Sequence, residues 1–218
     1  MLKILFVLFI TISLNAKEVG EVLFVKGVVK IKQNEKQIQA AKGQRFINRS
    51  LIETGNNALA VISLVDGSKI KLNKNSKIVI SVSSKSPTKV GIFKGSSFFN
   101  VLKSKISSKD KFIVKTKNAS IGVRGTEFFV SYGKDNAKDA WMCVNEGRVS
   151  VTPKDGKESV SVKAGEGVQI IGKKRVTKPK PLAWTRKLNW RLNSQDGDLE
   201  NKVNIEDAYT DLLDQDYD

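Results

Sequence analysis

Short runs rich in Val and Ile, separated by Gly, Asn, Asp and Lys, fill this chain from about residue 21 to residue 171. Apolar and polar side chains alternate in several of them, for example in residues 28–32 (Val-Val-Lys-Ile-Lys) and 148–151 (Arg-Val-Ser-Val). A period of two places one side of a strand in a core and the other side in water. No stretch of this region has a convincing helical period, so the sequence predicts an all-β roll, sandwich or solenoid of many short strands.

A short template recurs within these strands: a strand, a polar residue, a glycine and another strand. It is centred on Gly27, Gly95 and Gly147, and more loosely on Gly67. A glycine at such a position adopts a positive φ or lets two backbones pass closely, so the template predicts tight corners. The spacing between the corners is irregular, and the sequence therefore does not indicate a true repeat array.

The residue types exclude most catalytic and metal chemistry. None of the 218 residues is histidine, and Cys143 is the one cysteine. Ser-His-Asp triads, Cys-His pairs, His-ligated metals, four-cysteine sites and intrachain disulfides are therefore excluded, and no cofactor is expected. Cys143 is predicted to be a buried, small apolar residue. What remains is a binding or structural protein, or an enzyme built on Asp, Glu, Lys or Ser alone.

The N-terminus has the order of a secretory signal peptide. A basic start at residues 1–3 precedes the apolar stretch 4–14, and Ala16 is a small residue before the sequence turns polar at Lys17. The stretch is shorter than the roughly 20 residues of a membrane-spanning helix, and no second apolar run reaches that length. We predict that residues 1–16 are cleaved and that the protein is periplasmic or secreted, and not membrane-spanning after cleavage. A buried N-terminal strand and an uncleaved anchor are the alternatives.

The composition changes after residue 171. Residues 172–181 form a basic linker rich in Pro and Lys. Residues 182–192 carry Trp184, Leu188 and Leu192 at four-residue steps, which predicts a short amphipathic helix. Residues 193–218 form an acidic tail that is predicted to be disordered, or to form a helix only with a partner.

Charge is distributed unevenly along the chain. Lys and Arg number 38 against 22 Asp and Glu, a formal net charge of +16, yet residues 192–218 alone carry −8 and residues 17–191 carry +23. A basic body of this size attracts polyanions. We predict that the tail folds back on the basic body and competes with anionic partners. The alternative is a solvated tail that only improves solubility.

The most distinctive stretch is residues 115–131, which contains Gly122-Val123-Arg124-Gly125-Thr126 followed by Phe128 and Val130. It resembles the signature of the FecR domain family. Further features of the family follow in the right order: an opening strand pair around Gly20 and Gly27, Leu51-Ile52-Glu53-Thr54-Gly55, Asp66-Gly67-Ser68, residues 95–99, residues 144–149 and Ala164-Gly165-Glu166. The resemblance covers roughly Gly20 to Ile171 and implies a FecR-like β domain over residues 17–171.

The residue types of the signature indicate structural roles. Gly122 and Gly125 bracket a corner, and Phe128 and Val130 alternate with Phe129 and Ser131, as core strand residues do. A buried or half-buried Arg124 could bond several backbone carbonyls and pin neighbouring turns. This structural role is favoured over the alternative, in which Arg124 binds a ligand.

The best-known members of the family are transmembrane regulators whose periplasmic domain relays a signal from an outer-membrane receptor to a sigma factor. This chain departs from that pattern, because the leader leaves no room for a cytoplasmic segment and no spanning helix follows. The resemblance therefore implies the fold and a role in periplasmic interaction or sensing, without the anti-sigma function.

Three functions remain. The first is a non-enzymatic module that binds another envelope protein, and the second is an electrostatic binder of anionic envelope polymers such as peptidoglycan or lipopolysaccharide. An enzyme, such as a Lys/Ser or paired-carboxylate hydrolase, is the least favoured. Nucleic acid is disfavoured as a partner because the protein is predicted to be exported.

Overall fold

The structure is a computed structural model that describes residues 17–103, 112–133 and 139–214, so the predicted leader lies outside the described residues. The first strands are β1 (Glu18–Lys26), β2 (Val29–Gln33), β3 (Lys36–Gln39), β4 (Arg45–Ile47), β5 (Leu51–Thr54), β6 (Leu59–Leu64), β7 (Lys69–Leu72), β8 (Lys77–Ser81) and β9 (Thr88–Val101). The later ones are β10 (Phe112–Lys115), β11 (Ala119–Val123), β12 (Thr126–Tyr132), β13 (Ala140–Glu146), β14 (Arg148–Pro153), β15 (Val160–Lys163), β16 (Glu166–Ile171), β17 (Arg175–Val176) and β18 (Lys180–Pro181). The 3-10 helices η1 (Ala183–Arg186) and η2 (Ser194–Asp196) and the α-helix α1 (Ile205–Asp214) follow. The all-β prediction is confirmed.

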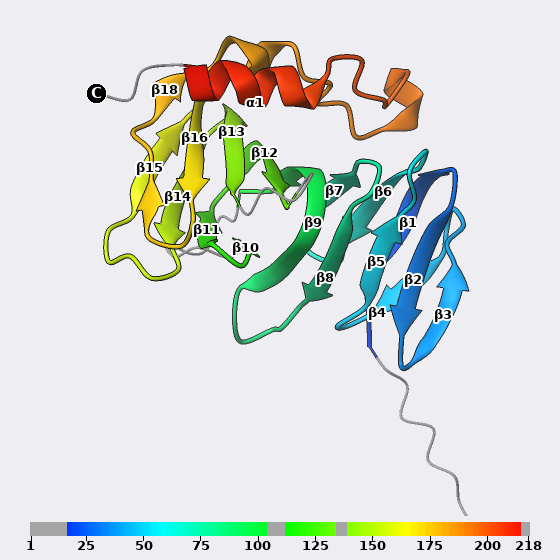
Figure 1. The fold of residues 1–218 in the computed structure, drawn as a ribbon. Helices are drawn as coiled ribbons and strands as arrows, with labels where there is room; N and C mark the ends of the chain where they lie inside the picture. The colour runs from blue at the N-terminus through cyan, green and yellow to red at the C-terminus, as the bar shows by residue number, and fades with distance from the viewer. Residues whose placement is uncertain (1–16, 104–111, 134–138, 215–218) are drawn as a thin grey trace, which may run out of the picture.

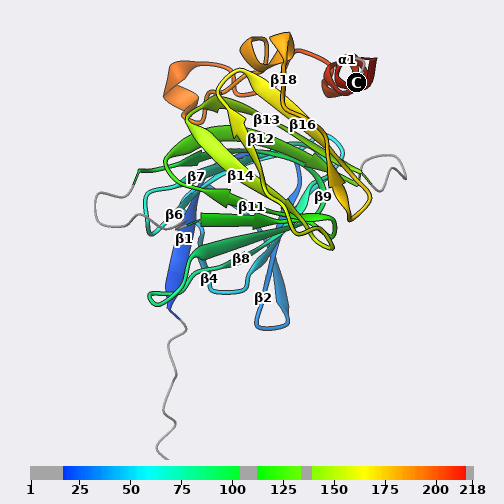
Figure 2. The ribbon, with the colours of Figure 1, turned by 90° about the vertical axis from the view of Figure 1, so that its left-hand side faces the viewer.

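The strands form two sheets that face each other (Figures 1 and 2). Sheet A runs β4–β1–β6–β7–β9–β12–β13–β16, with β17 and β18 beside β16. Sheet B runs β3–β2–β5–β8–β9–β10–β11–β14–β15. The pairing of β9 with β10 is parallel, and the others are antiparallel. Strand β9 belongs to both sheets, since residues 88–94 pair within sheet B and residues 95–101 within sheet A.

The glycine template marks the places where the chain turns between strands. Gly27 and Gly147 lie where the chain passes from sheet A to sheet B, and Gly95 lies where β9 passes from sheet B to sheet A. Gly95 has a φ of +87°, and a Cβ there would lie 2.4 Å from Ser76 Cα. The predicted corners are therefore present, and Gly67 turns a hairpin within sheet A.

The main core fills the space between the two sheets. It consists of the inward-facing residues of both, among them Phe46, Phe99, Phe112 and Phe128. The rings of Phe99 and Phe128 stack with centroids 4.8 Å apart. Each such side chain that leaves water stabilises the fold by about 1.5–3 kcal/mol.

A third layer covers the outer face of sheet A. Residues 182–214, here called the C-terminal cover, run across this face and end in α1, which lies above the sandwich in Figures 1 and 2. A second apolar cluster forms between them. Sheet A contributes Leu59, Val61, Phe98, Phe129, Trp141 and Cys143, and the cover contributes Leu182, Leu188, Leu192, Leu199, Ala208 and Leu212.

The cover differs from the prediction in two respects. The helix predicted over residues 182–192 is wrong, because η1 spans only Ala183–Arg186 and the chain beyond it is not helical as far as η2. The disorder predicted for the acidic tail is wrong for residues 193–214, because Leu199, Ala208 and Leu212 are buried against sheet A. The linker also takes part in the fold, since β17 and β18 pair with β16.

Candidate interaction surface

The signature residues form a corner at which β11 of sheet B leads into β12 of sheet A. Gly125 has a φ of +61°, and a Cβ there would lie 2.7 Å from Lys103 Cβ. The corner at Gly147 packs directly against it, since a Cβ on Gly147 would lie 2.8 Å from the Gly125 carbonyl oxygen. Two corners that join the two sheets therefore support each other at this end of the sandwich.

The Thr126 side chain links these two corners. The buried Thr126 hydroxyl donates to the carbonyl oxygen of Arg148 at 2.9 Å, which ties the start of β12 to the start of β14. Arg124 is exposed, so the expected burial or half-burial of its side chain is wrong. Val123, Phe128 and Val130 are buried in the main core, and Gly122 lies half-buried in β11.

The outer face of sheet A is occupied by the chain itself. Phe98 is completely buried there, with ring centroids 4.7 Å from Phe129 and 5.1 Å from Trp190 of the cover. The Trp190 indole N–H donates to the Thr185 carbonyl oxygen at 2.7 Å. Cys143 lies in the same cluster, and burial raises the pKa of its thiol to about 12, so the predicted small apolar role is confirmed and the thiol is unreactive.

Lys71 fixes the position of the cover. Its side chain is completely buried on the outer face of sheet A, and its ammonium donates to the carbonyl oxygens of Asn189, Arg191 and Leu199 at 2.5, 2.9 and 3.2 Å. Three carbonyls match the three N–H bonds of an ammonium group. The Nζ also lies 4.4 Å from the Phe98 ring centroid. Burial lowers the pKa of Lys71 from 10.5 to about 8, against the opposing influence of Glu127 and Asp198.

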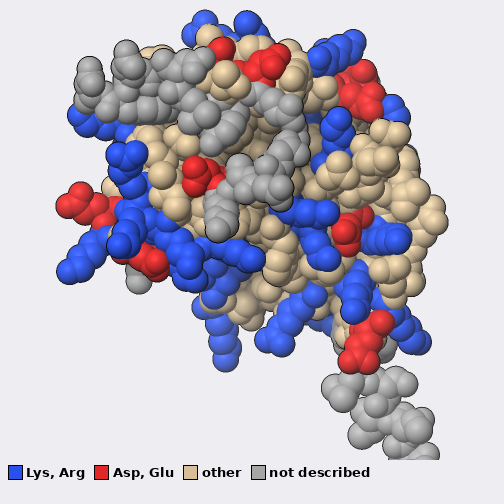
Figure 3. Space-filling view, viewed as in Figure 1, with Lys and Arg blue, Asp and Glu red and all other residues tan. Residues whose placement is uncertain are grey.

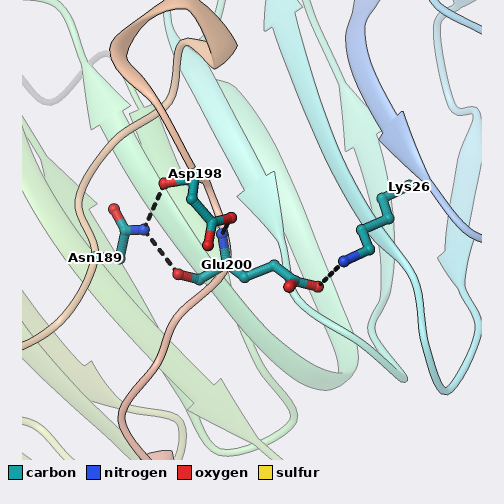
Figure 4. A network of polar contacts seen from close by, with 4 residues as sticks. All are labelled: Lys26, Asn189, Asp198 and Glu200. Atoms are coloured by element: carbon teal, nitrogen blue, oxygen red, sulfur yellow. Dashed lines mark hydrogen bonds and ion pairs between the residues drawn. The ribbon is translucent and has the colours of Figure 1, made fainter.

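The part of the cover that receives Lys71 is held in shape by its own polar groups (Figure 4). The Asn189 side-chain amide donates to the carbonyl oxygens of Asp198 and Glu200 at 2.9 and 2.8 Å. The Glu200 carboxylate forms an ion pair of 2.7 Å with Lys26 of β1. Both of these side chains are about half exposed, so the pair contributes little, and the apolar contacts and Lys71 hold the cover.

Glu127 is a second polar residue beneath the edge of this layer. Its carboxylate accepts hydrogen bonds from the side-chain amides of Asn100 and Asn145 at 3.3 and 2.6 Å. Burial raises the pKa of Glu127, and the two amides partly oppose this. Lys71 and Glu127 were not singled out from the sequence, because a lysine or glutamate in a short strand usually lies on a wet face.

The outer face of sheet B is the opposite case, because no described segment packs over it. Eight basic side chains point outward from this sheet, as the strand registers and the burial of their neighbours show. Glu53 is the one acid among the described outward positions. The basic residues are Lys30, Lys32, Lys77, Lys89, Lys94, Lys115, Arg148 and Lys163. We call this surface the basic face. Figure 3 shows Lys and Arg projecting from the lower part of the molecule, away from the C-terminal cover.

Apolar side chains lie among these charges. Leu51, Val79 and Ile113 face outward from β5, β8 and β10 and are only partly buried, and Phe93 of β9 is 50% exposed. Gly91 lies beside Val79 in the β8–β9 register and has no side chain, so the surface is recessed at this point. We call these five residues the apolar strip. A surface with an apolar centre and charged surroundings has the composition of a protein interface.

The tail does fold back on the body, but not on the basic face. Its residues 193–214 lie on sheet A, on the opposite side of the sandwich. Residues 193–214 therefore do not cover the basic face, and this arrangement does not support the predicted competition with anionic partners.

None of the described helices is long and apolar enough to cross a membrane.

Comparisons with known proteins agree with the sequence resemblance. Residues 50–150 match the FecR protein family, in agreement with the predicted resemblance. Two crystal structures of a candidate anti-sigma factor from Parabacteroides distasonis ATCC 8503 share the fold, each with 22% identity and a TM-score of 0.52. The similarity covers 60% of this chain and 59% of that protein. No curated protein matches the chain.

Proposed function

We propose that this FecR-domain protein is exported to the cell envelope and acts there as a non-enzymatic interaction or sensing module. The partner is another envelope protein, and it binds to the basic face. The observation that carries this proposal is the contrast between the two outer faces: the chain covers the apolar face of sheet A itself, and leaves a charged and partly apolar face on sheet B without a described cover.

The polar groups of the structure support binding rather than catalysis. The buried Lys71 is fully engaged with backbone carbonyls of the cover, and the Glu127 carboxylate accepts two amide hydrogen bonds. The Cys143 thiol is buried and has a raised pKa. These groups have structural partners of their own, whereas the basic face presents many charges spread over a wide surface, as binding requires.

Binding of an anionic envelope polymer is the alternative, and one observation favours it. Seven of the eight basic residues on the basic face are lysines. Lysine acts as a mobile point charge, whereas arginine supplies the planar fork that reads a fixed geometry. Such a surface can bind phosphate or carboxylate groups along a chain without a unique register.

The test is a pull-down from envelope extract with immobilised protein at low and high salt. A double variant, Lys89→Glu with Lys115→Glu, reverses two charges at the middle of the basic face. Lys173→Glu with Lys174→Glu is the matched control, because both residues are exposed on the turn before β17. Recovery of one protein that resists salt and is lost only in the first variant supports the proposal. Salt-sensitive recovery of polymer supports the alternative, and equal recovery by both variants contradicts the proposed surface.

Export is tested separately by mass spectrometry of the native protein. A mature N-terminus at or near Lys17 is expected. An intact Met1 on a cytoplasmic protein would contradict the envelope location.

A further inference from the structure

We infer that the basic face binds an acidic protein segment that also carries apolar side chains, which seat on the apolar strip beside Phe93. The inference rests on the proposed function and specifies its partner: a polypeptide with interspersed acidic and apolar residues, rather than a polysaccharide or another purely anionic chain.

The charges define the first requirement for the partner. Lys89 and Lys115 are exposed on the neighbouring strands β9 and β10. Lys32 of β2 is also exposed, and it pairs with Leu51 of β5, which in turn pairs with Val79 of β8. Glu53 is already paired with Lys77 at 3.4 Å, so it neutralises one lysine at the margin rather than at the centre. The remaining cations require acidic groups on the partner, which they also attract from a distance.

The apolar strip defines the second requirement. Phe93 is 50% exposed, although it belongs to a strand whose other aromatic residues, Phe98 and Phe99, are completely buried. Leu51, Val79 and Ile113 add partly exposed aliphatic surface on the adjacent strands. A purely anionic chain gains nothing from these side chains, whereas apolar side chains of a protein bury them and release water.

The shape of the surface suits an extended or shallow partner. The strands β2, β5, β8, β9, β10 and β11 lie side by side, and at about 4.8 Å per strand they span roughly 24 Å. Gly91 lies in the middle, and a Cβ there would meet Val79 Cγ1 at 3.0 Å, so a side chain at this position would crowd the strip. A width of this order is sufficient for a protein interface of ordinary size, about 800 Å² on each partner.

The test compares two flexible synthetic peptides of equal length and charge with the full chain by isothermal titration calorimetry at physiological salt. One repeats Gly-Glu-Leu and the other repeats Gly-Glu-Ser. Dextran sulfate serves as the anionic polymer without apolar groups. Phe93→Ser removes the aromatic residue at an exposed position, and Val65→Ser is the control, because Val65 is 61% exposed on the β6–β7 turn, outside the basic face.

The inference predicts that the Leu-containing peptide binds about tenfold more tightly than the Ser-containing one, and that Phe93→Ser but not Val65→Ser removes most of this difference. Equal affinities for the two peptides, an undiminished difference in Phe93→Ser, or tighter binding of dextran sulfate than of either peptide would overturn the inference. In those cases the proposed function can still hold, with a polymer as the partner. If neither the peptides nor dextran sulfate binds, the basic face is not an anion-binding surface, and the proposed function fails together with the inference.

Discussion

Two of the three phenylalanines of strand β9, Phe98 and Phe93, lie in opposite surroundings. Phe98, in the part that belongs to sheet A, is completely buried beneath the C-terminal cover, whereas Phe93, in the part that belongs to sheet B, is 50% exposed beside lysines. The two sheets share one core, so the difference lies in what their outer faces contact. One face is closed by the same chain, and none of the described segments covers the other. A comparison of these faces separates residues that hold the fold from residues that are available for binding.

The largest effect is expected from replacing each phenylalanine by alanine. Phe98→Ala leaves a cavity between sheet A and the cover, and should lower the free energy of unfolding by about 3–5 kcal/mol. Phe93→Ala removes a half-exposed ring, and should change it by about 1 kcal/mol or less. Urea denaturation of both variants measures the difference. Similar losses for the two variants would contradict the distinction between a closed and an open face.

Lys71→Met tests whether the ammonium positions the cover. The variant keeps the length of the side chain but leaves the carbonyl oxygens of Asn189, Arg191 and Leu199 without their shared donor. We expect a loss of about 2 kcal/mol and faster proteolysis within the cover. Lys69→Met, on the same strand and partly exposed, is the control. Unchanged proteolysis of the cover in Lys71→Met would show that apolar contacts alone position it.

The pH dependence of stability gives a smaller effect. Because the pKa of Lys71 is about 8 in the folded state and 10.5 ordinarily, the unfolded chain binds more protons between these pH values. The free energy of unfolding should therefore rise with pH in this window, by at most about 1.4 kcal/mol per pH unit from this group. Lys71→Met should lack this contribution. Parallel pH profiles of the two proteins would show that the folded pKa of Lys71 is not lowered.

The smallest effect is expected at the ion pair between Lys26 and Glu200. Both side chains are about half exposed, so Lys26→Ala should lower the free energy of unfolding by less than about 1 kcal/mol. High salt should likewise leave the cover in place, because its attachment is mainly apolar. Limited proteolysis across a salt series measures this, and release of the cover at high salt would show that charge holds it.

The sequence predicts sheet B better than it predicts the layer over sheet A. Residues 29–32 and 148–151 alternate between buried and exposed positions, as expected for strands with one wet face. In β6 the apolar residues run nearly without interruption, in β12 three apolar residues follow one another, and both sides of these strands are largely buried. Such runs are typical of a sheet covered on both faces. They are the signal in the sequence that could have indicated a covering layer.

The identity of that layer could not be predicted from local sequence. Leu199, Ala208 and Leu212 lie in an acidic segment whose composition indicates disorder, and they become ordered only because sheet A offers an apolar face assembled from distant strands. Lys71 lies in a Lys-Ile-Lys-Leu strand, whose alternation is typical of a strand with one solvent-exposed side. Only the folded cover supplies the carbonyl partners of its ammonium group. The signature predicts the corner at Gly125 correctly, whereas the hydrogen bond from Thr126 to Arg148 links residues that only the fold brings together.

Lysine acetylation followed by mass spectrometry, with and without the Gly-Glu-Leu peptide, tests the difference between the two faces most directly. The account predicts that Lys71 reacts far more slowly than Lys89 and Lys115, and that the peptide slows the reaction at Lys89 and Lys115 but not at Lys173 and Lys174. Acetylation of Lys71 as fast as that of the exposed lysines, or equal protection of Lys173 and Lys89 by the peptide, would contradict it.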